Sequence, residues 1–134
     1  MKSTALALLT SVLLTSGSAC SVDDRPVYSF VETNDAGEQV RVFKFAFTES
    51  KGDTCLGRGW KRVKVVYDAG NYTEDPVYRL ENARLEVLLR NSVCDAYDSY
   101  IGEVKKDGSF SGNHVLYGWS SKTIGSVTGS LSMP

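Results

Sequence analysis

Histidine occurs only once in this sequence of 134 residues, as His114. A metal site built from several histidines is therefore impossible, and a Ser/His or Cys/His active site has a single candidate base. An excess of charge is also missing, because 15 basic residues oppose 16 acidic ones and leave a formal net charge of -1. This balance provides no global positive field that would attract nucleic acid or anionic lipid.

Long hydrophobic runs are missing except near the start. The uncharged, mostly apolar run from Ala5 to Leu14 is shorter than the roughly 20 residues that a transmembrane helix needs. It follows the basic Lys2 and precedes small residues, an order typical of a secretory signal peptide cleaved after Ala19. We expect residues 1–19 to be the signal peptide, 20–26 a polar leader and 27–134 one β-domain.

The residues around the expected cleavage point, Gly17-Ser-Ala-Cys20, resemble the lipobox of bacterial lipoproteins. Gly17 departs from that family's pattern, which has Leu, Val or Ile at this position. The resemblance implies lipidation of Cys20 and attachment to the outer membrane, and membrane contact is expected only through this anchor. Cleavage by ordinary signal peptidase would instead place the protein in the periplasm or outside the cell. A eukaryotic secreted protein, such as a fungal one, fits the leader almost as well as a bacterial one.

Cysteine is scarce, with Cys20, Cys55 and Cys94 as its only occurrences. Export to an oxidising compartment favours a disulfide, and three pairings are possible. Cys20 lies in the polar leader, so the sequence favours a bond between Cys55 and Cys94.

The rest of the chain shows the two-residue alternation of β-strands. Strands are expected at Val27–Thr33, Val40–Thr48, Arg62–Tyr67, Arg84–Leu89, Tyr100–Val104, Ser109–Tyr117 and Thr123–Leu131. Alternation places Phe43, Phe45 and Phe47 on one face, and Val63 and Val65 on the inward face of the next strand.

The segment Val77–Arg84 is ambiguous, but Pro76 before it favours an extended chain. With about seven or eight short strands and no helical period, the sequence predicts an all-β fold, a single antiparallel β-barrel or β-sandwich. Half of the 12 glycines lie between Gly102 and Gly129. Such glycines let strongly coiled strands bend, and these final strands are similar to those of small exported barrels such as the lipocalins and avidins. No binding motif of those families is present.

Motifs for catalysis are missing as well. The chain has no G-x-S-x-G elbow, Walker loop, H-E-x-x-H or paired C-x-x-C, and no metal or cofactor is expected. His114 is expected in a strand, on the same face as Leu116, where it packs or hydrogen-bonds rather than transferring protons. Asp95, Asp98 and Glu103 are the acids that a cation or a glycosidase-like pair would use, although a polar loop explains the first two more simply.

Aromatic residues give the stronger indication of binding, because Tyr and Trp combine a large contact area with a polar group. The candidate partner-binding residues are Trp60, Tyr72, Tyr78, Tyr97, Tyr100, Tyr117 and Trp119. Trp60 belongs to a basic stretch, Arg58–Lys64, which also suits phosphate contacts; the slightly acidic chain as a whole disfavours nucleic acid.

The sequence therefore favours a non-enzymatic exported β-module of the cell envelope, binding or inhibitor-like, that recognises a protein, a glycan or a small apolar ligand. Two alternatives stay open: a small secreted carboxylate-dependent hydrolase, and a structural envelope lipoprotein. A deep apolar cavity would favour ligand carriage, convergent carboxylates in a cleft would favour an enzyme, and a filled interior would favour surface recognition.

Overall fold

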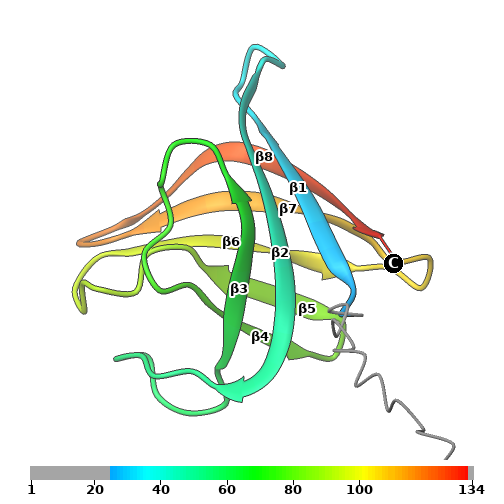
Figure 1. Cartoon of the computed structure of the whole chain (residues 1–134). Helices are drawn as coiled ribbons and strands as arrows, with labels where there is room; N and C mark the ends of the chain where they lie inside the picture. Colours follow the sequence, from blue (N-terminus) through cyan, green and yellow to red (C-terminus); the bar gives the residue numbers. More distant parts are fainter. Residues whose placement is uncertain (1–24, 133–134) are drawn as a thin grey trace, which may run out of the picture.

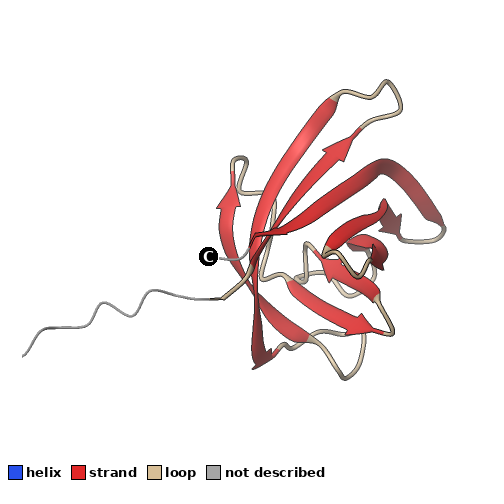
Figure 2. Ribbon diagram, turned by 90° about the vertical axis from the view of Figure 1, so that its right-hand side faces the viewer, coloured by secondary structure: helices blue, strands red, loops and turns tan. Residues whose placement is uncertain are grey.

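The computed structural model describes residues 25–132, which form a closed antiparallel β-barrel without a helix (Figure 1; Figure 2). Each strand pairs with the next along the chain, and the last strand pairs with the first. The strands are β1 (Val27–Thr33), β2 (Gln39–Lys51), β3 (Lys61–Asp68), β4 (Val77–Glu81), β5 (Arg84–Leu88), β6 (Tyr97–Val104), β7 (Ser109–Tyr117) and β8 (Ser121–Ser132). The all-β expectation is confirmed, and the architecture is the barrel rather than the sandwich. The expected signal peptide and Cys20 lie outside the described residues.

The expected strands are all present. β1 and β7 have the expected bounds, and the ambiguous Val77–Arg84 is extended as β4 and then turns at Asn82 and Ala83, whose φ angles are 49° and 66°. Asp107-Gly108 connects β6 to β7 as a turn, and Gly108 has the positive φ of 84° that favours glycine there.

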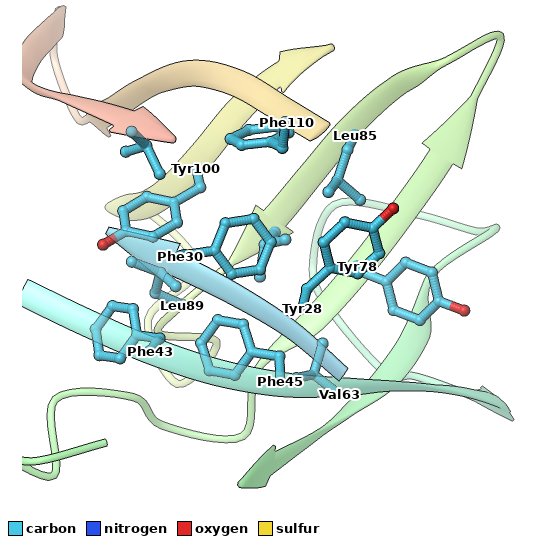
Figure 3. Close-up of a cluster of buried hydrophobic side chains, with 12 residues drawn as sticks. Tyr28, Phe30, Phe43, Phe45, Val63, Tyr78, Leu85, Leu89, Tyr100 and Phe110 are labelled. Carbon is cyan, nitrogen blue, oxygen red and sulfur yellow. The ribbon is translucent and has the colours of Figure 1, made fainter. Parts of the chain in front are cut away.

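Aromatic side chains fill the inside of the barrel (Figure 3). Phe30 is fully buried and meets Phe110 edge to face, with ring centroids 5.3 Å apart. The expected common face of Phe43, Phe45 and Phe47 is confirmed, because the first two are buried and the third packs against the same cluster. The core therefore occupies the space that a ligand would take in a hollow barrel.

Glycines on the last strands make room for these large side chains. A Cβ on Gly129 would lie 3.0 Å from Phe30 and 3.1 Å from Phe110. Gly102 and Gly112 pair across β6 and β7, and a Cβ on either would collide with the backbone of the other strand. The expectation that these glycines shape the barrel agrees with their surroundings.

The weakest junction of the barrel lies between β3 and β4, which pair only at Lys61–Tyr78 and Arg62–Val77. Beyond this junction β3 pairs with β2 alone, and that pairing contains two irregularities, between Lys44 and Phe45 and between Phe47 and Lys51 on β2. Val63 is buried as expected, but the prediction that Val65 points inward is wrong, because 37% of Val65 is exposed. Alternation along a strand could not show that its neighbour on one side ends so early.

A second, smaller cluster lies outside the barrel. The β2–β3 connection turns back over β4 and β5, where Trp60 is buried with Val77 and Leu88. Cys55 in this connection forms the predicted disulfide with Cys94 in the β5–β6 loop, with Cα atoms 5.5 Å apart. A disulfide is compatible with export. Within residues 25–132, no helix has the length and apolarity to span a membrane.

Candidate functional site

Three ionisable side chains converge inside one end of the barrel. This end carries the β1–β2, β3–β4, β5–β6 and β7–β8 connections, and it is named here the hairpin end. They are Glu32 from β1, Asp98 from β6 and His114 from β7. His114 has no exposed surface and Glu32 is only 1% exposed. Buried charges are costly unless they are paired, so their mutual arrangement decides what the site can do.

His114 lies between the two carboxylates. Its Nδ1 is 2.8 Å from Oε1 of Glu32, and its Nε2 hydrogen-bonds Oδ1 of Asp98. Carboxylate oxygens can only accept, so both bonds form when both ring nitrogens carry hydrogen and the imidazole is positively charged. Burial lowers the pKa of His114, but the hydrogen bonds to Asp98 and Glu32 outweigh it and raise the pKa above its ordinary value.

Glu32 accepts hydrogen bonds from two further side chains. The hydroxyl of Tyr100 donates to its Oε2 at 2.9 Å, and Nη1 of Arg41 lies 3.1 Å from the same oxygen. Burial alone would raise the pKa of Glu32, but the hydrogen bonds from His114, Tyr100 and Arg41 outweigh it, and the pKa is lowered. Two carboxylates, one imidazolium and one guanidinium thus form a cluster without net charge, in which Glu32 and His114 are fully buried. It is named here the ion cluster (Glu32, Arg41, Asp98, His114).

Tyr72 connects the ion cluster to the β3–β4 loop. Its hydroxyl donates to Oδ2 of Asp98, and its ring lies under the guanidinium of Arg41, 4.2 Å from the centroid. Burial and the bond to Asp98 raise the pKa of Tyr72, so the hydroxyl stays protonated and keeps donating. Asp68 accepts the N–H and hydroxyl of Thr73, both at 2.8 Å, which fixes the loop on either side of Tyr72.

A glycine makes the ion cluster possible. β8 lies between β1 and β7, so Glu32 crosses β8 to reach His114. It crosses at Gly125, where an added Cβ would lie 2.8 Å from Oε1 of Glu32. Any side chain at this position would compete with the carboxylate for the same space.

Two surface grooves flank Tyr72 and Asp98. The first, named here the tyrosine groove, has a volume of about 260 Å³ and is lined by Arg90, Val93, Ala96, Tyr97, Asp98, Leu116 and Tyr117. The second, named here the edge groove, has a volume of about 370 Å³ and is lined by Gln39, Val40, Arg41, Val42, Phe43, Tyr67, Asp68, Ala69, Gly70 and Tyr72. The ion cluster thus supports the walls of both grooves from inside the barrel.

The structure separates the aromatic candidates into two groups. Tyr72, Tyr97 and Tyr117 are half-buried at the hairpin end, and Trp119 is fully exposed in the β7–β8 turn. The other three, Trp60, Tyr78 and Tyr100, are buried. Trp60 lies beneath the guanidinium of Arg79, whose central carbon is 4.7 Å from the ring, so its ring is not open for stacking on a base.

Sequence reasoning missed the ion cluster. His114 hydrogen-bonds, as expected. The β6–β7 register runs without a shift through this part of β7, so His114 and Leu116 keep the expected common face, although Leu116 is 36% exposed and His114 is buried. A usable signal was present in β1. Tyr28 and Phe30 point inward, and the same alternation carries Glu32 to the inward face. An acid at a core-facing position requires a buried partner.

The other acids do not join this site. Asp95 is exposed in the β5–β6 loop, and Glu103 is exposed near the far end of β6. Within the described residues, no group of three or more His, Cys, Asp or Glu side chains is arranged to hold a metal ion. In the ion cluster, only Arg41 and Asp98 reach the surface, with side chains 32% and 11% exposed.

Comparisons of the chain with protein-family models, curated proteins and solved structures gave no match. The fold and the site together define an antiparallel barrel with a filled interior and a braced, loop-bearing end.

Proposed function

We propose that the protein is a non-enzymatic exported recognition module, binding or inhibitor-like, that holds a protein partner in the tyrosine groove. The export part of this proposal depends on the amino-terminal sequence and is supported by the disulfide.

The observation that carries the proposal is the apolar surface around the tyrosine groove. Val93 is 53% exposed, Leu116 is 36% exposed, and Trp119 is fully exposed nearby in the β7–β8 turn. Tyr97 and Tyr117 add two half-buried rings to the groove wall. Exposed apolar side chains gathered at one place are typical of protein-binding sites, and Trp and Tyr are the residues that most often dominate their energy.

The filled interior supports surface recognition over carriage of an apolar ligand. The inward side chains of the core pack against one another through the middle of the barrel (Figure 3). For the hydrolase alternative, the buried carboxylates among residues 25–132 are those of Glu32 and Asp98, and both are bonded to His114. His114 itself has no exposed atom that could meet a substrate, so the site gives that alternative little support.

The test compares retention of partner proteins by the purified exported protein and by two variants. The immobilised proteins are exposed to envelope and secreted proteins of the source organism, and bound proteins are quantified by mass spectrometry. Trp119→Ser combined with Leu116→Ser removes the apolar surface. Leu80→Ser is the matched control, because Leu80 is 51% exposed but lies on β4, outside the tyrosine groove.

We expect a defined set of proteins to be retained by the parent and the control, and to fall at least about tenfold with the double variant, as for loss of a dominant aromatic contact. Equal retention by all three proteins would overturn the proposal. Binding to an array of glycans that disappears only in the double variant would replace the protein partner with a glycan.

A further inference from the structure

At the hairpin end, β2 extends beyond the end of β3. The last pair between the two strands joins Phe43 to Asp68, so the segment Gln39–Val42 pairs with β1 alone. In Figure 1 this β1–β2 hairpin projects beyond the neighbouring strands. Along a strand paired on one side only, alternate residues direct their N–H and C=O groups away from the partner strand. No backbone partner occupies that side of Gln39–Val42 within the described residues.

The edge groove lies along this unpaired side. Its walls come from Val40 and Val42 on β2, from Tyr67 at the end of β3 and from Tyr72 in the loop, with Phe43 at its base. Four residues of strand edge span about 13 Å, at roughly 3.3 Å per residue. A segment lying here would continue the line of β3 and pair with β2 in its place.

Arg41 gives the edge groove a charge preference. Only its Nη1 bonds to Glu32, and no hydrogen bond to Nε or Nη2 occurs among residues 25–132. Arg41 lines the groove with 32% of its side chain exposed, and its guanidinium lies over the ring of Tyr72. A carboxylate in the groove would meet unused donors whose orientation is already fixed. Asp68, the acid in the groove wall, already accepts the N–H of Gly70 and two groups of Thr73.

We propose that the edge groove binds an extended, acidic peptide segment of a partner, which adds to the sheet as a strand beside Gln39–Val42 and places a carboxylate on Arg41. The unpaired backbone of β2 supplies main-chain hydrogen bonds, and Arg41 and Tyr67 supply the side-chain selectivity. This site goes beyond the proposed function. It is separate from the tyrosine groove, since Tyr72 and Asp98 lie between the two.

The first test is a selection of random octapeptides on the immobilised exported protein. We expect enrichment of peptides that combine β-branched residues with Asp or Glu, as strand addition beside a guanidinium requires. Cationic peptides, or no enriched peptides, would overturn the proposal. Binding of glycans alone would also overturn the proposal. Self-association of the protein that Tyr67→Ala abolishes would overturn it as well, because the occupant would then be a second copy of the chain.

The second test uses an enriched peptide and two N-methylated versions of it. Methyl groups on the alternate residues that face β2 should weaken binding at least tenfold, because they remove donors to the strand edge. Methyl groups on the other alternate residues should change affinity less than twofold. Exchanging the peptide's Asp or Glu for its amide should weaken binding several-fold. Equal effects of both methylation patterns would overturn strand addition. This test changes only the peptide and leaves the protein unaltered.

Protein variants then locate the site. Tyr67→Ala removes a wall of the edge groove, whereas Val66→Ala removes an equally exposed neighbour that does not line it. We expect about a tenfold loss for the first and no change for the second; equal losses would refute the location. Trp119→Ser combined with Leu116→Ser should leave peptide affinity unchanged, so this site and the tyrosine groove succeed or fail separately.

Discussion

The imidazole of His114 holds together the interior of the hairpin end. It lies between Glu32 and Asp98. Without its positive charge, Glu32 would keep its ion pair with Arg41, whereas Asp98 would lose the ion pair that it has among residues 25–132. Removing one member of a buried ion cluster is far more costly than removing an exposed ion pair, because the remaining charges stay out of water. We therefore expect His114 to act on stability and loop position.

The pH dependence of stability should reveal the ion cluster. The raised pKa of His114 stabilises the fold fully below its ordinary 6.5, and this contribution is lost as pH rises through the folded value. The lowered pKa of Glu32 contributes above its ordinary 4.5 and is lost as pH falls through the folded value. The free energy of unfolding should therefore be largest between pH 4.5 and pH 6.5, where both contributions are fully present. Urea titration at a series of pH values measures this.

In His114→Gln the decline above pH 6.5 should disappear, because the titrating group is gone. In the parent the decline can reach about 1.4 kcal/mol per pH unit. The comparison of slopes remains informative although the variant is less stable at every pH. If the free energy of unfolding falls equally steeply in the two proteins above pH 6.5, His114 is not the group that causes the decline.

Gly125→Ala should disturb the same ion cluster from the β8 side. The added Cβ would lie 2.8 Å from Oε1 of Glu32 and 3.1 Å from the carbonyl oxygen of Thr33. A Glu32 side chain that moved away from the added Cβ would lose its hydrogen bonds to Arg41, Tyr100 and His114, so we expect a loss of roughly 2 kcal/mol in thermal or urea unfolding. Gly118→Ala is the control, since no atom lies within 4 Å of its Cβ position. Equal stability of the two variants would show that Glu32 moves without cost.

At the scale of single residues, the sequence predicted which phenylalanines are buried but not the pairing of His114 with Glu32. Alternation correctly placed Phe43 and Phe45 inside, because each strand carries that information by itself. The pairing of His114 with Glu32 depends on closure of the barrel, which brings together residues 82 positions apart. No local pattern encodes that distance, although an acid on the apolar face of β1 indicated that a partner was needed.

Among the elements, the β2–β3 connection depends on the disulfide. It covers β4 and β5 with Trp60, and Cys55 attaches it to the β5–β6 loop. Cys55→Ser should lower the melting temperature in oxidising buffer. The bridge closes a loop with a sequence separation of 39, for which chain entropy predicts about 4 kcal/mol.

A reductant serves as the control for this prediction. It should lower the melting temperature of the parent to that of Cys55→Ser and leave the variant itself unchanged. If neither the Cys55→Ser substitution nor the reductant lowers the melting temperature, the bond does not form in the exported protein.

The strands were predictable because turn residues and alternation are local properties. The early end of the β3–β4 pairing was not predictable, since it depends on the shortness of β4 and on where β4 begins beside β3. The edge groove follows from a similar mismatch in length between β2 and β3. Both features depend on where neighbouring strands end relative to each other, and a single strand does not record this.

At the scale of the whole molecule, processing of the amino terminus is the first prediction. Residues 1–19 should be absent from the exported protein, so that the chain begins at Cys20. Intact-mass measurement checks this, and an additional diacylglycerol mass would establish the lipid anchor. A mature chain that begins before Ser16 would refute the signal-peptide assignment.

The position of the disulfide also determines what the barrel becomes when it opens. Two residue pairs, Lys61–Tyr78 and Arg62–Val77, join β3 to β4, and the Val63 N–H bonds the Pro76 carbonyl directly before β4. The covalent link from Cys55 to Cys94 spans this same side of the cylinder. In a reducing environment, rupture of that junction would turn the cylinder into a curled sheet with two new unpaired margins. Unpaired margins invite pairing between molecules. Reduction of the bond between Cys55 and Cys94 should therefore make copies of the chain more prone to assemble with one another.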